Sequence, residues 1–314
     1  MNFIIIFLLI TFLFYLSNIF IHNFTLEKFT NIKLNIGNYL VLYFYQMGKT
    51  FLEGTDFYYI EKNIDFIQHL PSYVPLNIKI YQELIDNKFT IKELETEEKE
   101  IIMVAMWTII NKRREKFWLI MKPLINEILE NALQESNLKK KVEYPVIHFR
   151  CSDTPFVKNG YYFFQKYKFF TDALTEIKKE KKEDYKKVIL LSCNFHKSND
   201  KNSNTCNIYA ESLKKYLEKS GYETIIECKT NIEDFATIFY APAIISTCSS
   251  FSFIAGFFSN GIFISEGHYN CNDDNSKKCI DCGDWLKYGY SISHKDIIDY
   301  YDTETVIKIL SDGQ

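Results

Sequence analysis

The chain has 314 residues, of which 47% are hydrophobic and 25% charged, with only 11 glycines and 6 prolines. This composition excludes a disordered, collagen-like or low-complexity protein, because the apolar side chains suffice to offset the entropy lost when the chain becomes ordered. The 37 basic and 40 acidic side chains leave a net charge of −3, which argues against a dedicated nucleic-acid-binding protein.

Residues 3–21, FIIIFLLITFLFYLSNIFI, carry no charge, and every charged residue lies after position 22. At about 1.5 Å per residue this run nearly crosses the hydrocarbon core of a bilayer, so it predicts a transmembrane helix. A cleaved signal peptide or a buried helix would be the alternatives. No basic residue precedes the run, and Ser17–Ile19 is not a small-residue cleavage site. We therefore expect a membrane anchor in residues 1–22, whose orientation the weakly charged flanks leave open.

A polar stem, residues 23–33, leads into a segment without cysteine that we expect to form a first lobe, residues 34–140. Apolar residues at helical or strand spacing indicate the elements of this lobe. The expected elements are a helix over 39–52, a short strand over Phe57–Ile60 and helical sequence over 94–133. The charged run 134–143 is a plausible linker.

From residue 144 onward, apolar strand-like runs alternate with helical stretches. The predicted strands are Pro145–Arg150, Val188–Ser192, Glu223–Glu227, Ala243–Ser246 and Ile262–Ser265, and the predicted helices cover 161–180, 205–220, 231–240 and 250–258. Asn231 and Ser249 are candidate N-caps. This alternation indicates an α/β lobe over residues 141–314, with a parallel sheet covered on both faces. Such sheets bind ligands at the carboxyl ends of their strands.

Polar residues follow the first of these strands, in His148-Phe149-Arg150-Cys151-Ser152-Asp153. Alternation along a strand places His148 and Arg150 on one face. A guanidinium suits a diphosphate, because its planar fork donates two charged hydrogen bonds. Asp153 could orient Arg150, cap a turn or accept a proton. A structural ion pair at the end of the strand is the alternative interpretation.

Hydroxyl side chains follow the fourth strand, in Ser246-Thr247-Cys248-Ser249-Ser250-Phe251-Ser252, where a helix is expected to begin. Hydroxyls and unpaired N–H groups at a helix start can bind phosphate, although ordinary N-capping would also place a serine there. A third motif, Asn35-Ile36-Gly37-Asn38, is expected to form a turn between a stem strand and the following helix. Gly37 would permit positive φ or a close backbone approach, and Asn38 supplies an amide.

All eight cysteines lie after residue 150, which suits an oxidising compartment where some of them could pair. Four ligand-type residues near the end of the chain have spacing that would also permit zinc. They are His268, Cys271, Cys279 and Cys282. Because two CxxC halves would be a stronger zinc signature, we favour disulfides or free structural thiols there and expect no metal.

The order of the three polar motifs resembles that of the GDP-fucose-dependent fucosyltransferases, the superfamily of the α1,2-, α1,6- and protein O-fucosyltransferases. These enzymes carry G-x-G-N, then H-x-R-R-x-D, then S-S/T-F-S. The resemblance spans about residues 31–265. It implies a GT-B architecture, in which two Rossmann-like lobes hold the donor between them. Residues 34–140 would form the acceptor-side lobe and residues 141–314 the nucleotide-sugar lobe with its cysteine-rich tail.

The resemblance implies metal-independent, inverting transfer of fucose from GDP-fucose to a glycan or protein, without a cofactor, by an enzyme anchored in the ER or Golgi membrane. Arg150 and Asp153 match the family's catalytic positions. The positions that match the family's donor-contacting residues are Gly37, Asn38, His148, Arg150, Ser249, Ser250, Phe251 and Ser252. The chain departs from the pattern at Asn35, where a glycine is usual, and at Cys151, where a second arginine is usual. The alternatives are an inactive nucleotide-sugar-binding or scaffold protein and a transferase that uses another nucleotide sugar.

Overall fold

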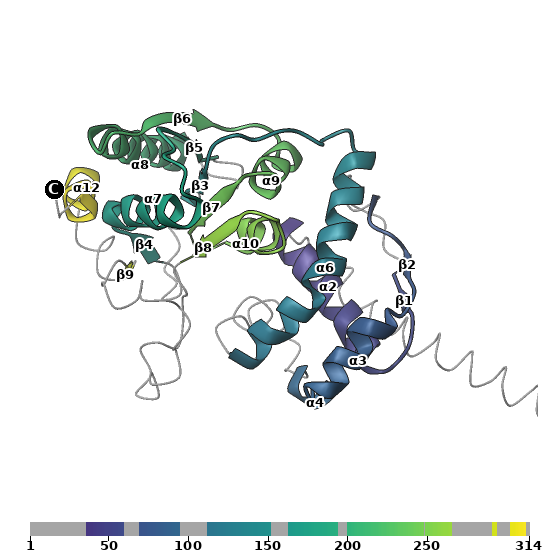
Figure 1. Cartoon of the computed structure of the whole chain (residues 1–314). Helices are drawn as coiled ribbons and strands as arrows, with labels where there is room; N and C mark the ends of the chain where they lie inside the picture. The colour runs from purple at the N-terminus through teal and green to yellow at the C-terminus, as the bar shows by residue number, and fades with distance from the viewer. Residues whose placement is uncertain are drawn as a thin grey trace, which may run out of the picture. The chain divides into compact units, whose positions relative to one another are not determined.

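The computed structural model describes residues 36–59, 69–94, 112–151, 163–193, 200–247, 249–265, 291–293 and 302–311 (Figure 1). Residues Ile36–Gln314 form one compact unit. The anchor and stem predicted in residues 1–33 lie outside the described ranges. Within those ranges, no helix is both long enough and apolar enough to cross a membrane.

A five-stranded parallel sheet forms the centre of the C-terminal half and confirms the predicted α/β class. Its strands are β3 (Val146–His148), β5 (Lys187–Leu191), β6 (Glu223–Glu227), β7 (Ala243–Ser246) and β8 (Ile262–Ser265). They lie in the order β6-β5-β3-β7-β8. The first strand of the sheet in sequence, β3, is therefore central. The next two, β5 and β6, lie on one side of it, and the last two, β7 and β8, lie on the other. This is the doubly wound arrangement, and its switch point lies between β3 and β7.

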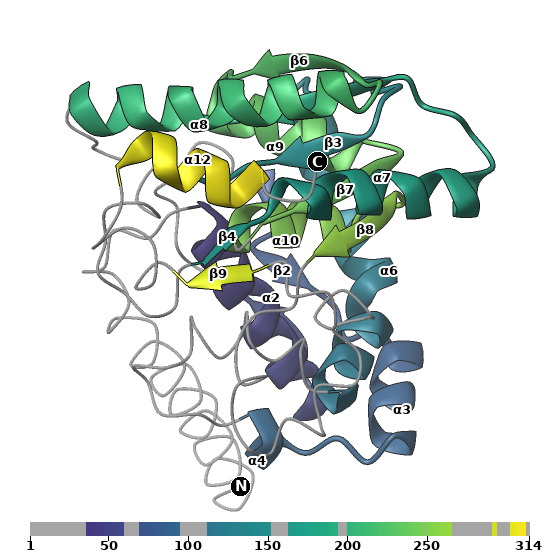
Figure 2. The ribbon, with the colours of Figure 1, turned by 90° about the vertical axis from the view of Figure 1, so that its left-hand side faces the viewer.

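Helices cover both faces of this sheet (Figures 1 and 2). They are α7 (Tyr167–Lys181), α8 (Asp200–Lys219) and α12 (Thr303–Ser311) on one face, and α9 (Asn231–Phe239) and α10 (Ser250–Phe257) on the other. Alternate residues of β3 face opposite layers, so Ile147 packs in the core with α7 and α8 while Val146 is buried toward the other face. Strands buried on both faces explain the nearly continuous apolar sequence of the sheet.

In the described residues of the N-terminal half, helices accompany one short antiparallel strand pair. Its elements are α2 (Ile36–Leu52), β1 (Phe57–Tyr58), β2 (Tyr73–Val74), α3 (Ile78–Asp86), α4 (Ile91–Leu94) and α6 (Lys112–Glu135). The aromatic side chains of Phe44 and Trp118 both pack against Phe258, which follows α10. Asn126 of α6 donates to the Phe258 carbonyl at 2.7 Å. These contacts join the half to the end of α10. Its described residues form no parallel sheet, so a second Rossmann-like lobe stays a prediction.

Three local predictions are wrong in detail. The helix expected over 161–180 begins only at Tyr167, because Phe163–Gln165 form β4, which pairs with β9 (Ser291–Ser293) far along the chain. The cap of α9 is Thr230 instead of Asn231, since Thr230 and Glu233 form a reciprocal capping box. The third, at Gly37, concerns the functional site and is described with it.

Candidate functional site

Hydrogen bonds of Thr247 link the carboxyl ends of β3 and β7 at the switch point. Its Oγ1 accepts a hydrogen bond from the Arg150 backbone N–H at 2.9 Å and donates one to the His148 carbonyl at 3.1 Å. The Thr247 backbone N–H donates to the same carbonyl at 3.2 Å. These bonds fix the chain where it leaves β3, and they hold His148 and Arg150 at the edge where doubly wound sheets bind ligands.

Of the two neighbouring side chains His148 and Arg150, only Arg150 carries a charge at physiological pH. Burial, and secondarily the positive charge of Arg150, lower the pKa of His148 to about 3. The imidazole is therefore neutral at physiological pH beside a guanidinium that keeps its charge. The His148 Nδ1 is buried and makes no hydrogen bond within the described part of the chain. Such a pair offers an anionic ligand one cation and one neutral imidazole nitrogen.

The serines near the beginning of α10 differ in whether their side chains make structural hydrogen bonds. The Ser252 hydroxyl is fully buried and lies 2.7 Å from that of Ser246, so this pair stabilises the turn from strand to helix. Ser249 is the N-cap residue with extended backbone, yet its side chain makes no capping hydrogen bond. The first N–H groups of a helix have no intrahelical acceptor and carry partial positive charge. With the unused Ser249 cap, they suit a phosphate.

Gly37 lies in the first turn of α2, so the turn predicted between a strand and this helix is wrong. A Cβ atom at Gly37 would stand 2.4 Å from the Phe251 nitrogen and 2.6 Å from its Cα. The glycine is thus required by a close approach of two backbones. It carries no positive φ.

Asn38 and Phe251 complete the contact between the beginnings of α2 and α10. The Ser250 hydroxyl donates to Asn38 Oδ1 at 2.6 Å. The Phe251 ring lies 5.8 Å from the His148 ring and 5.5 Å from the Phe235 ring. The structure therefore brings together all three polar motifs, although they are far apart in the sequence.

Several residues singled out in the sequence lie outside the described ranges. They are Asp153, Cys248 and the His268, Cys271, Cys279 and Cys282 cluster. Phe163 and Phe164 belong to β4 and not to the expected helix. The bridging role of Thr247 was not predicted from the sequence. The available signal was its hydroxyl side chain, directly after β7.

Cys151 belongs to the core of the lobe and not to its ligand-binding edge. It forms a disulfide with Cys206 of α8, and both residues are 1% exposed. Cys151, the position where the fucosyltransferase motif would have an arginine, thus forms a covalent link between the end of β3 and the helix layer. Nothing in the sequence identified its partner.

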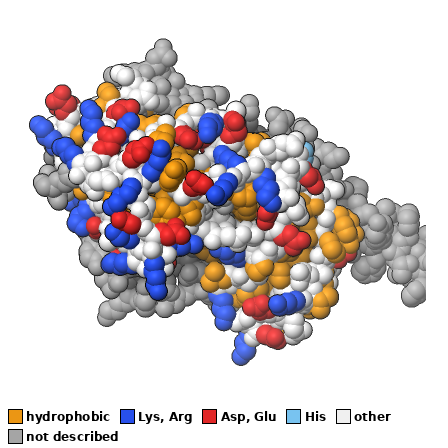
Figure 3. All heavy atoms as spheres, turned by 45° about the horizontal axis from the view of Figure 1, so that its top comes forward, with side chains coloured by type: hydrophobic (Ala, Val, Ile, Leu, Met, Phe, Trp, Pro, Cys, Tyr) orange, Lys and Arg blue, Asp and Glu red, His pale blue; other side chains and the backbone are white. Residues whose placement is uncertain are grey.

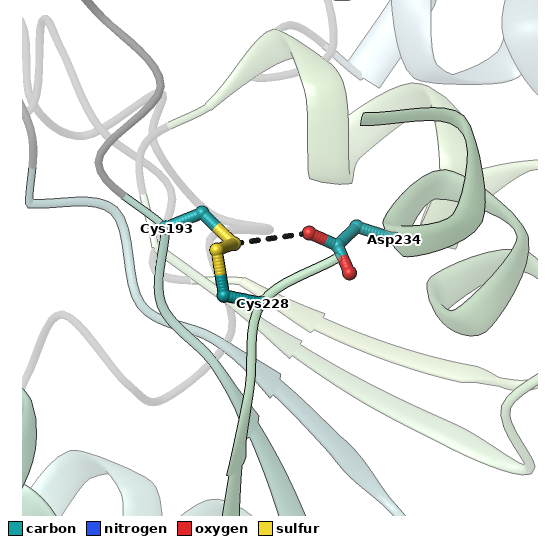
Figure 4. A group of neighbouring side chains, drawn as sticks. All are labelled: Cys193, Cys228 and Asp234. Atoms are coloured by element: carbon teal, nitrogen blue, oxygen red, sulfur yellow. Dashed lines mark hydrogen bonds between the residues drawn. A yellow bond between two sulfur atoms is a disulfide. The ribbon is translucent and has the colours of Figure 1, made fainter. Parts of the chain in front are cut away.

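A second disulfide joins Cys193 and Cys228 (Figure 4). Their sulfur atoms and a carboxylate oxygen of Asp234 all lie within 4.8 Å of one another, a grouping that suits a metal ion. Because the two sulfurs are bonded to each other, they offer no thiolate to a metal in this state.

Acidic and basic side chains are interspersed over the face drawn in Figure 3, and no extended patch of one sign appears on that face.

No family model matches the chain, and no curated protein or solved structure matches it significantly. The likeness to fucosyltransferases accordingly rests on the three motifs, their order and what their residues can do chemically.

Proposed function

We propose that the chain is a glycosyltransferase that binds a nucleotide diphosphate sugar at the carboxyl ends of β3 and β7. The observation that carries this proposal is the convergence of Gly37–Asn38, His148–Arg150 and Ser249–Ser252 at the switch point of the sheet. A doubly wound sheet binds nucleotides at this point. The motif resemblance favours GDP-fucose as the donor.

Arg150 stabilises the leaving diphosphate in this proposal. Sugar transfer separates charge, since the anomeric carbon becomes cationic while the diphosphate departs with negative charge. A preorganised cation and helix N–H groups stabilise that charge without reorganising during the reaction. The neutral His148 imidazole can hydrogen-bond the donor without adding a titrating charge, because its pKa lies near 3.

Asp153 is the proposed general base for the acceptor hydroxyl. Asp56, a second aspartate that could serve as this base, accepts hydrogen bonds from the Leu76 N–H at 2.8 Å and the Tyr73 hydroxyl at 3.0 Å. Its two carboxylate oxygens thus hold the β1–β2 region together, which favours a structural role for Asp56. A base is required only where the acceptor proton must be removed in the transition state.

The remaining parts of the proposal concern architecture and location. Residues 34–140 would form the acceptor-side lobe of a GT-B-like enzyme, with a glycan or protein as acceptor. Residues 3–21 would anchor the enzyme in the ER or Golgi membrane with its catalytic part in the lumen. Two disulfides among the described cysteines support an oxidising compartment.

A panel of nucleotide sugars, assayed for release of the nucleotide, tests the proposed activity. We expect wild-type protein to turn over one donor, GDP-fucose first among them, and Arg150→Ala to lose at least about 100-fold in rate, the typical effect of removing one transition-state donor. Lys187→Ala, which removes a half-buried cation paired with Glu223, is the matched control and should keep the wild-type rate. Binding of a donor without turnover would instead favour an inactive nucleotide-sugar-binding protein.

A further inference from the structure

A second group of reactive side chains lies at the same edge of the sheet, beyond the proposed donor site. Cys193 follows β5 and Cys228 follows β6, so their disulfide joins the ends of two adjacent parallel strands, with the Cα atoms 5.2 Å apart. Asp234 of α9 points its carboxyl group at the bridge (Figure 4). No sequence motif pointed to this arrangement, and the proposed sugar transfer does not use it.

The Asp234 carboxyl group is buried against the disulfide. The residue is 4% exposed, and its Oδ2 lies 3.1 Å from Cys193 Sγ. The Lys229 backbone N–H donates to both carboxyl oxygens, at 3.2 and 3.4 Å. Because a disulfide sulfur carries no proton, a hydrogen bond between Asp234 and Cys193 in this state requires the proton to come from the carboxyl group.

The surroundings of Asp234 favour that protonated form. Burial raises the pKa of Asp234 to about 6, against the lowering effects of the Lys229 N–H and of the Lys140 and Lys229 charges, while Glu227 raises it further. A carboxyl group with a pKa near neutrality can both give and accept a proton under physiological conditions. Asp234 is therefore suited to proton transfer at the adjacent sulfur.

The two disulfides differ in access. Cys228 is exposed, whereas Cys151 and Cys206 are each 1% exposed. Thiol–disulfide exchange requires an attacking thiolate to reach one sulfur along the axis of the bond, so an exposed sulfur decides which bridge reacts. In the Cys193–Cys228 bridge, Cys228 is the exposed residue, and the buried Asp234 carboxyl group lies beside the Cys193 sulfur.

We propose that Cys193–Cys228 is a thiol-exchange site at which the thiolate of a small molecule or a protein attacks Cys228 and Asp234 protonates the departing Cys193 sulfur. A new bond forms between the attacking sulfur and Cys228 Sγ, and the Cys193–Cys228 bond breaks with its electron pair going to Cys193. The Asp234 carboxyl group then gives its proton to that sulfur. In the reverse direction the Asp234 carboxylate removes the proton of the Cys193 thiol, which attacks the mixed disulfide and expels the external thiolate.

Reduction of the native full-length chain by glutathione tests which bridge exchanges. The protein is incubated with glutathione, quenched by alkylation and digested, and the alkylated cysteine peptides are identified by mass spectrometry. We expect Cys193 and Cys228 to become reduced at least about tenfold faster than Cys151 and Cys206, because attack depends on access to a sulfur. Equal rates, or faster reduction of Cys151–Cys206, would overturn the proposal.

The pH dependence of the same reaction tests the role of Asp234. The rate is divided by the glutathione thiolate concentration at each pH from 5 to 8. For wild-type protein this corrected rate should fall about tenfold or more as the pH rises through 6, because the acid form of Asp234 is lost. Asp234→Asn should give a flat profile, since an amide has no acidic proton.

Glu233→Gln is the matched control, because its neighbouring carboxylate faces the Thr230 N–H and not the disulfide. It should retain the wild-type profile. Resistance of Cys151–Cys206 to alkylation in the same samples reports that each variant is folded. The wild-type profile decides the matter even if Asp234→Asn does not fold, because a wild-type corrected rate that is independent of pH would exclude Asp234 as the proton donor.

Discussion

The Ser250 hydroxyl donates to Asn38 Oδ1 at 2.6 Å, although 212 residues separate the two in the chain. Ser250 begins α10 and Asn38 lies in the first turn of α2, so the bond joins the beginnings of two helices. It places the N-terminal half against the switch point of the parallel sheet. The position of the serine turn therefore depends on residues from both halves.

A double-mutant cycle measures this link. We expect Ser250→Ala and Asn38→Ala each to lower the free energy of unfolding, and the double variant to lose less than the sum of the two. The coupling should be about 0.5–1.5 kcal/mol, the net value of a typical intramolecular hydrogen bond. Urea denaturation of the four proteins gives the coupling directly. Strictly additive losses would mean that the two side chains do not interact in solution.

Gly37→Ala tests the close approach of the two backbones. A Cβ there would meet the Phe251 backbone, which cannot move without shifting the start of α10, so we expect a loss of about 1–3 kcal/mol in stability together with weaker donor binding. Gly48→Ala in the same helix is the control, because the atoms nearest to its Cβ would belong to the Phe117 ring and not to the backbone of α10. It should lower the melting temperature and leave donor affinity unchanged. Equal donor affinity for Gly37→Ala and wild type would contradict a role for this contact in shaping the site.

The sheet was predictable from the sequence because each strand is a short apolar run between helices. Val188–Ser192 and Ala243–Ser246, for example, coincide closely with β5 and β7. The positions of polar residues at strand ends were also predictable, because a strand and the loop after it are adjacent in the sequence. His148, Arg150 and Ser249 were therefore identifiable as candidates before their neighbours were known.

Features that depend on distant partners were not predictable. The strand pair β4–β9 joins segments far apart in the sequence, and the local aromatic pattern before Tyr167 fits a helix as well as a strand. The sequence predicts a turn at Gly37 because the residue that it contacts, Phe251, lies in another part of the chain. The partner of Cys151 was hidden for the same reason, since cysteine spacing alone does not fix connectivity.

Loss of the Cys151–Cys206 bridge should destabilise the C-terminal half. The bridge closes a sequence separation of 55 residues, for which chain-entropy arguments give about 4 kcal/mol, and measured losses are typically about 2–4 kcal/mol. We expect Cys151→Ser, Cys206→Ser and the double variant to lose similar amounts in urea denaturation. A double variant as stable as wild type would show that the bridge does not constrain the unfolded chain.

His148 should make the stability of the protein depend on pH. Its pKa is lowered to about 3 in the folded state from an ordinary value of 6.5, so below pH 6.5 the unfolded chain binds one more proton than the native protein. The associated stability is fully present above pH 6.5 and is lost as the pH falls toward 3.

Urea denaturation at pH 7.5 and pH 5 measures this effect. Between the two conditions, the free energy of unfolding of wild type should fall by up to about 2 kcal/mol more than that of His148→Gln. One proton contributes about 1.4 kcal/mol for each pH unit between 6.5 and 5. Arg150→Gln should lose nearly as much as wild type, because burial, the larger cause of the lowered pKa of His148, remains. Identical losses for wild type and His148→Gln would show that the imidazole titrates normally.

Calorimetric titration with GDP measures whether Arg150 and the α10 terminus form the proposed binding site for a nucleotide diphosphate. We predict saturable binding of GDP, much weaker binding of guanosine, and a loss of about 1.5–3 kcal/mol in binding free energy for Arg150→Ala, the value of a hydrogen bond to a charged group. Lys187→Ala should bind as wild type does. Equal affinity of wild type and Arg150→Ala for GDP, or equal affinity of wild type for GDP and guanosine, would mean that Arg150 and the α10 terminus do not bind a diphosphate.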